Sequence, residues 1–393
     1  MKVYLDNSAT TRQYDQVTDA MIEMMRDGWG NPSSLHLMGV ESEKSMRGAR
    51  KIFASSIGAS EDEVYFTSGG TESDNTVLNG VAQAKKRSGK KIITTAVEHP
   101  AILEPAKRLE TLGYEVSYIG VDRNCRLNME QLEAALSEDT ILISIMGVNN
   151  ETGTIMPIKE IAALKDKFNK EHKTDILLHS DAVQAFGKVP VHVKGDYRGV
   201  DLLSVSGHKI HGPKGMGGLY VRKGINLTPF MLGGGQERHM RSGTENTPAM
   251  VGFGKAIELA TKDFAGRVAT METARRTLLE GLKAEVKDIL INSPEGEGEC
   301  APSVLNVTFM GTRGEVLLHT LEQDGIYVST GSACSSNKKG QSHVLKAMGL
   351  KDKEIEGAIR FSFSEFNTVE EMEYVLEKVK AAVTRFRRLG SFR

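Results

Sequence analysis

The chain reads TILISIM at residues 140–146, DILLHS at 175–180 and DLLSVS at 201–206, and these three runs decide the fold class. Each run has the length of a strand and is almost continuously apolar, which is typical of strands that are covered on both faces. Segments of helical periodicity separate most of the strand-like runs, of which the others lie at 63–67, 91–95, 115–119 and 218–221. This alternation predicts an α/β domain with a mainly parallel sheet.

The sequence pattern changes after residue 257. A long charged helix is expected over 258–290, and a segment rich in proline and glycine follows it. Beyond that segment, strands and helices are expected at 306–310, 315–323, 326–329, 358–364 and 369–385. We therefore expect a large domain of residues 15–257 and a smaller α+β domain built from residues 1–14 and 258–393.

Bulk composition excludes several classes of protein. The 50 basic and 51 acidic residues leave a formal net charge of -1, so charge gives no reason to expect nucleic acid or an anionic membrane as a partner. The first fifteen residues lack the apolar stretch of a signal peptide, and no apolar run approaches the roughly 20 residues that span a bilayer. We expect a cytoplasmic protein. A disulfide framework and a metal site are not expected, because no C-x-x-C pair occurs among Cys125, Cys300 and Cys334.

The segment FTSGGTESDN at 66–75 predicts a phosphate-binding site. A strand runs into Gly69 and Gly70, and a helix then begins near Thr71. Glycines allow the backbone to come close to a ligand, and a helix N-terminus offers free N–H groups and a positive dipole end. The alternative is an ordinary helix cap by Thr71, with Asp74 in the first turn.

Two further polar segments follow apolar strands. In HSDAVQAFGK (179–188), Asp181 needs a positive partner if it is buried, and Gln184 could reach the same ligand; a capping aspartate is the alternative. In SVSGHKIHGPKGMGGLY (204–220), Lys209 could form a Schiff base with an aldehyde, or be an ordinary solvated lysine. A phosphate site, a strand-end aspartate and a strand-end lysine in this order are the parts that a pyridoxal 5'-phosphate (PLP) enzyme needs.

The chain resembles the cysteine desulfurases of the NifS and IscS type, within the fold-type I PLP enzymes that are similar to aspartate aminotransferase. The resemblance covers essentially the whole chain. Its blocks are YLDNSATT (4–11), NPSSLH (31–36), FTSGGTES (66–73), EHPA (98–101), NNETG (149–153), SGHKIHGPKG (206–215), GGGQE (233–237), RSGTEN (241–246), SACSS (332–336) and RFS (360–362).

The resemblance implies a role for each matching residue. Lys209 would hold the PLP, Asp181 would pair with its ring nitrogen, and Gln184 would hydrogen-bond its ring oxygen. His99 would lie against the ring and help to move protons.

The resemblance also implies how phosphate and substrate are held. Arg360 would fork onto the carboxylate of the substrate, and Asn150 would assist at both the cofactor and the substrate. Thr244 would reach the phosphate of the neighbouring subunit, which requires a homodimer. The phosphate contacts within one chain would come from Gly70, Thr71, Ser206 and His208.

Cys334 lies in the small, polar segment STGSACSSNKKGQS (329–342), which has no apolar face that would bury it. Reactive cysteines are accessible and have positive charge nearby, and Lys338 and Lys339 supply such charge. We therefore expect Cys334, on a loop of about 331–342, to accept sulfur. A loop cysteine without a role is the alternative, and it is our reading of Cys125 and Cys300.

The activity implied by the resemblance is conversion of L-cysteine to L-alanine, with a persulfide formed on Cys334. The sulfur would pass to an iron–sulfur scaffold or another acceptor protein, or to tRNA thiolation. The alternatives are a selenocysteine lyase or an aminotransferase of the same fold, and a non-catalytic scaffold. One departure is visible, because His239 stands where the family usually has a glycine.

Overall fold

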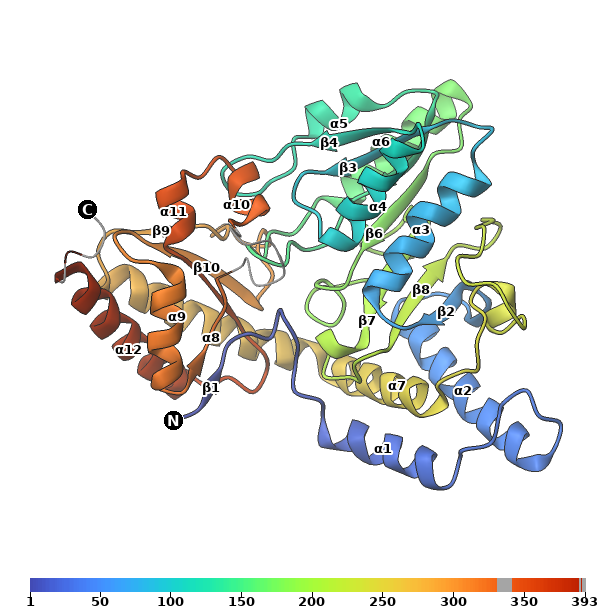
Figure 1. Cartoon of the computed structure of the whole chain (residues 1–393), viewed down its shortest axis with the longest axis horizontal. Helices are drawn as coiled ribbons and strands as arrows, with labels where there is room; N and C mark the ends of the chain where they lie inside the picture. The colour runs from blue at the N-terminus through green and yellow to red at the C-terminus, as the bar shows by residue number, and fades with distance from the viewer. Residues whose placement is uncertain (331–340, 389, 391–393) are drawn as a thin grey trace.

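The computed structural model describes residues 1–330, 341–388 and 390, and all seven strands expected between residues 63 and 221 form and join one sheet (Figure 1). In sheet order they are β2 (Val64–Thr67), β8 (Gly217–Val221), β7 (Leu202–Ser206), β6 (Leu177–Asp181), β5 (Thr140–Ser144), β3 (Lys91–Thr95) and β4 (Glu115–Ile119). Strand β8 runs antiparallel to both of its neighbours, and the other neighbouring pairs are parallel. The predicted α/β fold with a mainly parallel sheet is confirmed.

Alternate residues of the central strands face two different hydrophobic cores. Leu142, Leu177 and Leu202 belong to one core, and the residues that follow each of them belong to the other. The core that contains Leu142 also receives side chains from α3 (Gly70–Ala84) and α4 (Pro100–Thr111). The core that contains Ile143 receives side chains from five helices, which are α1 (Asp15–Arg26), α2 (Leu37–Ser56), α5 (Met129–Ala135), α6 (Ile158–His172) and α7 (Thr247–Lys262). Helices therefore cover both faces of the sheet, which is why its strands are continuously apolar.

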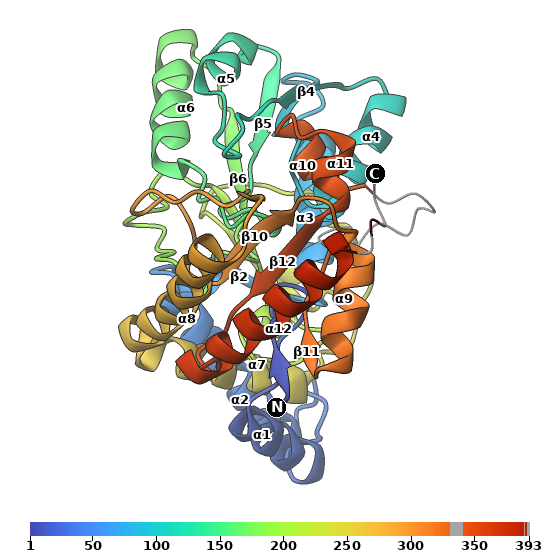
Figure 2. The same cartoon turned by 90° about the vertical axis from the view of Figure 1, so that its left-hand side faces the viewer.

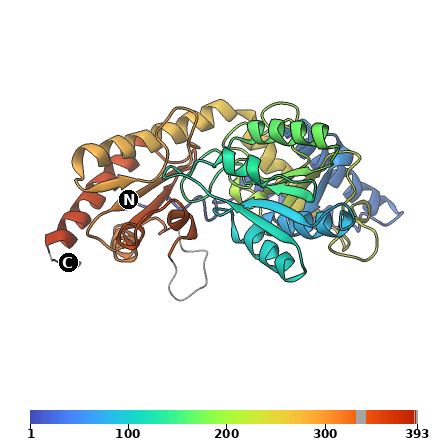
Figure 3. The same cartoon turned by 90° about the horizontal axis from the view of Figure 1, so that it is seen from above.

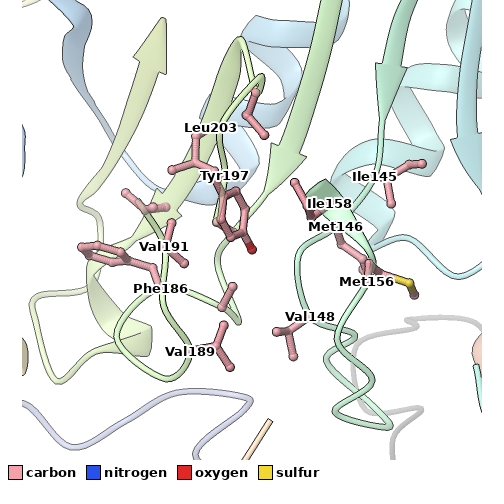
Figure 4. Packing of buried hydrophobic residues seen from close by; sticks show 14 of the residues in the cluster. Ile145, Met146, Val148, Met156, Ile158, Phe186, Val189, Val191, Tyr197 and Leu203 are labelled. Atoms are coloured by element: carbon pink, nitrogen blue, oxygen red, sulfur yellow. The ribbon is translucent and has the colours of Figure 1, made fainter. Parts of the chain in front are cut away.

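Packing is tight where the central strands end. Met146, Tyr197 and Leu203 belong to the same core (Figure 4). A Cβ atom added at Gly147 would lie 2.1 Å from the hydroxyl oxygen of Tyr197, so a larger residue cannot stand there without displacing the ring. Glycine at this position therefore lets the chain pass close to Tyr197 as it leaves the end of β5.

A second group of strands lies beside the first. Strands β12 (Ala358–Ser362), β10 (Val304–Phe309) and β9 (Ile289–Ile291) form an antiparallel sheet, and β1 (Val3–Tyr4) pairs in parallel with β11 (Ile326–Tyr327). Figure 2 shows the helices that cover these strands, which are α8 (Phe264–Glu285), α9 (Gly314–Gln323) and α12 (Val369–Arg388). The shorter helices of this part are α10 (His343–Ala347) and α11 (Asp352–Glu356).

The two groups of strands form the two lobes that Figure 3 shows from above. The N-terminal segment belongs to the second lobe by its packing, because Val3 and Leu5 lie in the core formed with α8 and α12. The division at residues 14/15 and 257/258 stays a prediction. Among the described helices, none has both the length and the apolar character needed to cross a bilayer.

The prediction of one helix over 258–290 was wrong. The chain breaks at Asp263, which separates α7 from α8 and has a φ of -132° and a ψ of 57°. An oxygen of its side chain accepts a hydrogen bond from the backbone N–H of Gly266, so this aspartate caps the start of α8. Residues 289–291 form strand β9 instead of continuing the helix.

Candidate active site

A cavity of about 250 Å³ opens at the carboxyl edge of the central sheet. Strands β6 and β7 end at Asp181 and Ser206, and α3 begins at Gly70, so all three elements lead into it. In open α/β sheets this edge is where ligands bind. The predicted site residues that line the cavity are Gly70, Thr71, His99, Asn150, Asp181, Gln184, Ser206, His208, Lys209 and Arg360.

Lys209 ends a short 3₁₀ helix, η2 (Gly207–Lys209), directly after β7. Its Nζ donates hydrogen bonds to the backbone carbonyls of Ser8 and Ala9, the latter at 2.8 Å. The N-terminal segment therefore forms a wall of the cavity and holds the lysine there. These carbonyl acceptors keep the amine at the cavity, where an aldehyde of a ligand could reach it.

The start of α3 offers uncapped backbone N–H groups to the cavity. Its N-cap is Gly69, with φ 151° and ψ 179° and no side-chain cap hydrogen bond, so the alternative of a cap by Thr71 is wrong. A Cβ atom at Gly70 would lie 2.6 Å from Cγ2 of Val183. The glycine pair therefore places a bare helix end beside the cavity, as anion binding requires.

His208 lies on the same side of the cavity as the start of α3. Its Nδ1 lies 3.1 Å from the hydroxyl oxygen of Thr10. Burial, and then the charges of Lys209, Lys214 and Lys188, lower the pKa of His208 to about 4. The ring is therefore neutral at pH 7 and can serve as a hydrogen-bond partner without a net charge.

Asp181 ends β6 and is buried. Its Oδ1 accepts a hydrogen bond from the backbone N–H of Val183 at 2.9 Å. This oxygen therefore makes the local capping contact that was the alternative for Asp181. Burial raises the pKa of Asp181 to about 6, and the charge of Lys209 acts against that rise. A protonated heterocyclic nitrogen in the cavity would supply the positive partner that a buried carboxylate needs.

His99 is the N-cap of α4, and its Nδ1 accepts a hydrogen bond from the backbone N–H of Ala101 at 3.1 Å. Burial, and then the charges of Lys209 and His343, lower the pKa of His99 to about 4. The ring is thus neutral at pH 7. Because Nδ1 accepts, the proton of the neutral ring is on Nε2, where it is available as a donor.

Arg360 enters the cavity from β12, on the other lobe. Its Nη2 donates to Oδ1 of Asp6 at 2.8 Å and its Nη1 donates to the carbonyl of Asn150 at 3.0 Å. Its buried Nε has no hydrogen-bond partner among the described residues. The predicted pair of Arg360 and Asn150 is therefore adjacent, and both residues line the cavity.

The sequence matches the model of the class-V aminotransferase family over residues 3–375. This chain belongs to that family. Over 388 residues it is 46% identical to the cysteine desulfurase IscS of Methanosarcina thermophila, an alignment that covers 99% of this chain and 93% of that relative.

Solved structures give the same result. A NifS-like protein superposes with a TM-score of 0.90 at 41% identity, covering 98% of this chain and 100% of the other. A structure described as SspA in complex with cysteine superposes with a TM-score of 0.80 at 33% identity, covering 93% and 100%. Class-V aminotransferases and cysteine desulfurases are PLP-dependent enzymes, so the predicted family, fold type and cofactor are confirmed.

The polar groups that line the cavity are suited to binding PLP. Two buried oxygens of residues that line the cavity, Oγ of Ser8 and Oδ1 of Asp74, have no hydrogen-bond partner among the described residues. Buried polar atoms of this kind are satisfied by water or by a bound polar group, and PLP would supply such a group here. The bare helix end, the lysine and the buried aspartate match the phosphate, the aldehyde and the ring nitrogen of PLP.

Several residues of the cavity were missed from the sequence. Ser8 and Ala9 contribute backbone carbonyls, for which no side-chain signal exists. Asp74 was read as part of a helix cap, but it is 1% exposed and lines the cavity. Its position in the fifth residue of α3, facing inward, is a helical-periodicity signal that could have found it.

Thr244 does not line the cavity of its own subunit, where it is exposed. Cys334 lies outside the described residues. Near Thr244, His239 has a φ of 68°, in the left-handed region that favours glycine. The departure noted at this position therefore places a histidine in a conformation that costs about 1–2 kcal/mol for residues other than glycine.

Proposed function

We propose that this protein is a PLP-dependent cysteine desulfurase that converts L-cysteine to L-alanine and holds the sulfur as a persulfide on Cys334. One observation carries the proposal: Lys209, Asp181 and Arg360, which are far apart in the sequence, line one cavity. Together they supply an amine, a buried carboxylate and a guanidinium, which an amino-acid-converting PLP enzyme needs. The names of the relatives supply the substrate class.

The residues of the chain divide the reaction among them. PLP, when bound, supplies an electron-poor ring that stores the charge left when the α-proton of the substrate is removed. Arg360 binds the carboxylate of L-cysteine, and its contacts with Asp6 and Asn150 hold the guanidinium in place. Nζ of Lys209 takes up the α-proton and returns it to the carbon that becomes the methyl group of alanine, and the proton given up by the Cys334 thiol replaces it on the α-carbon. The neutral ring of His99 offers its Nε2–H beside them.

The sulfur step belongs to Cys334. Its thiolate attacks the sulfur of the substrate, a sulfur–sulfur bond forms, and the carbon–sulfur bond breaks with its electron pair passing to the carbon. The described residues on either side of the 331–340 segment support this role. The backbone of Ser329 exchanges hydrogen bonds with Arg360, and the ring of His343 lies 2.9 Å from the carbonyl of Glu98. Cys334 follows Ser329 by five positions, and five residues of extended chain span at most about 18 Å. Cys334 therefore lies within about 18 Å of Ser329, whose backbone is hydrogen-bonded to Arg360.

A homodimer is part of the proposal, because Thr244 would complete the phosphate site of the second subunit. Exposed apolar side chains support this surface as an interface. Leu35 is 99% exposed and Leu232 is 83% exposed, and the neighbouring side chains Leu37, Val40 and Phe230 are also exposed. Exposed apolar side chains at 35–40 and 230–232 support the proposal that a partner covers these two segments.

The remaining proposals concern the sulfur acceptor and the compartment. We propose an iron–sulfur scaffold or another sulfur-acceptor protein as the partner, and the cytoplasm as the compartment. A selenocysteine lyase or an aminotransferase of the same fold is the second candidate. An aminotransferase has no use for Cys334, whereas both desulfurase and lyase chemistry form alanine.

The test is to incubate the purified protein with L-cysteine and a reductant and to measure alanine and sulfide together. Equal amounts of both are expected, and a Cys334→Ala variant should lose sulfide release while keeping its bound cofactor. Cys300→Ala is the matched control and should keep the wild-type rate. Pyruvate in place of alanine, or full activity in Cys334→Ala, would contradict the proposal.

A further inference from the structure

Lys188 is a second lysine behind the cavity, seven residues after Asp181. It is 5% exposed, and its Nζ donates a hydrogen bond to Oε1 of Gln184 at 2.9 Å. Among the described residues, the nearby carboxylates of Glu365 and Asp6 are paired with Arg267 and Arg360. The side-chain amide of Gln184 is therefore the group that this buried lysine contacts.

The other end of the Gln184 amide is also fixed. Its Nε2 donates to the carbonyl of Ser8 at 2.9 Å. A backbone carbonyl can only accept and a lysine Nζ always carries N–H groups, so both contacts require the same orientation of the amide. The carbonyl of Ser8 also accepts from Nζ of Lys209. A chain of hydrogen bonds thus runs from Lys188 through Gln184 and Ser8 to Lys209.

This orientation decides what Gln184 offers to a ligand. The amide nitrogen carries two hydrogens, of which Ser8 takes one, and Gln184 lines the cavity. The second N–H is therefore available as a donor on the side of the cavity. A donor at this place favours an ionised oxygen of the ligand over a protonated one.

We propose that Lys188 is a positioning residue, which holds the Gln184 amide so that its N–H, and not its carbonyl, faces the ring oxygen of PLP. This inference rests on the proposed function, because it requires PLP in the cavity. Without Lys188, Oε1 of Gln184 would be a buried acceptor that lacks its donor, and only the contact with the Ser8 carbonyl would oppose rotation of the amide. The ring oxygen would then meet a carbonyl in part of the molecules.

The charges around Lys188 come from several elements. Burial, and then the positive charges of Lys209, Arg267 and Arg360, lower the pKa of Lys188 to about 7, while Glu365 acts in the opposite direction. Both the charged and the neutral amine carry N–H groups. The hydrogen bond to Gln184 therefore persists on either side of neutral pH.

The test measures the visible absorption of the bound cofactor as a function of pH, in the full-length holoprotein. The ring oxygen of PLP shares a proton with the nitrogen that links PLP to Lys209. An N–H donor that stabilises the ionised ring oxygen lowers the pKa of this shared proton. In Lys188→Met, which keeps the apolar stem, the midpoint of the absorption change should move to higher pH by on the order of one unit. Gln184→Ala should move it in the same direction.

A double variant separates positioning from simple packing. If Lys188 acts through Gln184, Lys188→Met should add no further shift in a Gln184→Ala background. Lys194→Met, at an exposed lysine six positions later, is the matched control and should keep the wild-type midpoint. Lys188→Gln retains an N–H donor and serves as the second variant, with a midpoint close to wild type expected.

Three outcomes would overturn the inference. They are an unshifted midpoint in a folded Lys188→Met protein, additive shifts in the double variant, and a Lys188→Gln midpoint shifted as far as that of Gln184→Ala. Purified wild-type protein that shows no visible cofactor band would instead overturn the proposed function, and this inference with it.

Discussion

Arg360 joins the two lobes, and its substitution is the sharpest test of substrate binding by a single residue. Arg360→Lys keeps the charge but loses the planar pair of N–H donors that a carboxylate accepts. Loss of one charge-assisted hydrogen bond, worth about 1.5–3 kcal/mol, predicts that kcat/KM for L-cysteine falls about 10- to 100-fold. Because PLP does not depend on this contact, its absorption should persist.

Steady-state kinetics would measure the change, and most of it should be in KM. Arg313→Lys, at a half-exposed arginine that pairs with Glu356, is the matched control. A KM that stays at the wild-type value in Arg360→Lys would contradict the assignment of the carboxylate site.

Individual residues also show why part of the site could be predicted from the sequence. Lys209 and Asp181 follow apolar strands, and a strand end marks the ligand-binding edge of such a sheet. Arg360 could be assigned only through the family resemblance, because nothing local distinguishes it from a surface arginine. Ser8 and Ala9 act through backbone carbonyls, which every residue possesses, so their side chains carried no signal.

At the scale of elements, the start of α3 is the part of the site most sensitive to a single carbon atom. Gly70→Ala places a Cβ against Cγ2 of Val183, so either the helix end or that side chain must move. We expect a weaker affinity for PLP, by about tenfold for a loss near 1.4 kcal/mol.

A second substitution should reverse this loss. Val183→Ala removes the clashing carbon, and the double variant should regain most of the wild-type affinity in an equilibrium titration of PLP. Gly48→Ala, in α2, has no atom within 4 Å of the added Cβ and is the control. A double variant that binds PLP no better than Gly70→Ala would show that the steric argument is wrong.

The elements themselves followed closely from the sequence wherever one physical signal dominated. Strands β3 and β4 have the predicted bounds, because each is a short run with β-branched or aromatic residues between polar turn segments. The helix predicted over 258–290 failed because Asp263 was read as one more charged residue of a helix. Its role as a cap depends on the backbone turn between α7 and α8.

At the scale of the whole molecule, buried titratable groups gather near the cavity and act on stability in opposite directions. Burial raises the pKa of Glu98 to about 8 and lowers the pKa of His179 to about 3. The stabilising effect of neutral Glu98 is complete below its ordinary pKa near 4.5 and is lost as the pH rises toward 8. That of neutral His179 is complete above 6.5 and is lost as the pH falls.

Glu98→Gln separates the two effects, because His179 is present in both proteins and cancels in their difference. Relative to wild type, the variant should gain stability steadily between pH 5 and 8, at no more than about 1.4 kcal/mol per pH unit. Thermal unfolding of both proteins at several pH values, with PLP at one fixed saturating concentration, measures this difference. Glu133→Gln, at an exposed glutamate, should follow the wild-type curve. If the Glu98→Gln and wild-type curves run parallel from pH 5 to 8, Glu98 is ionised in the folded protein and burial does not govern its titration.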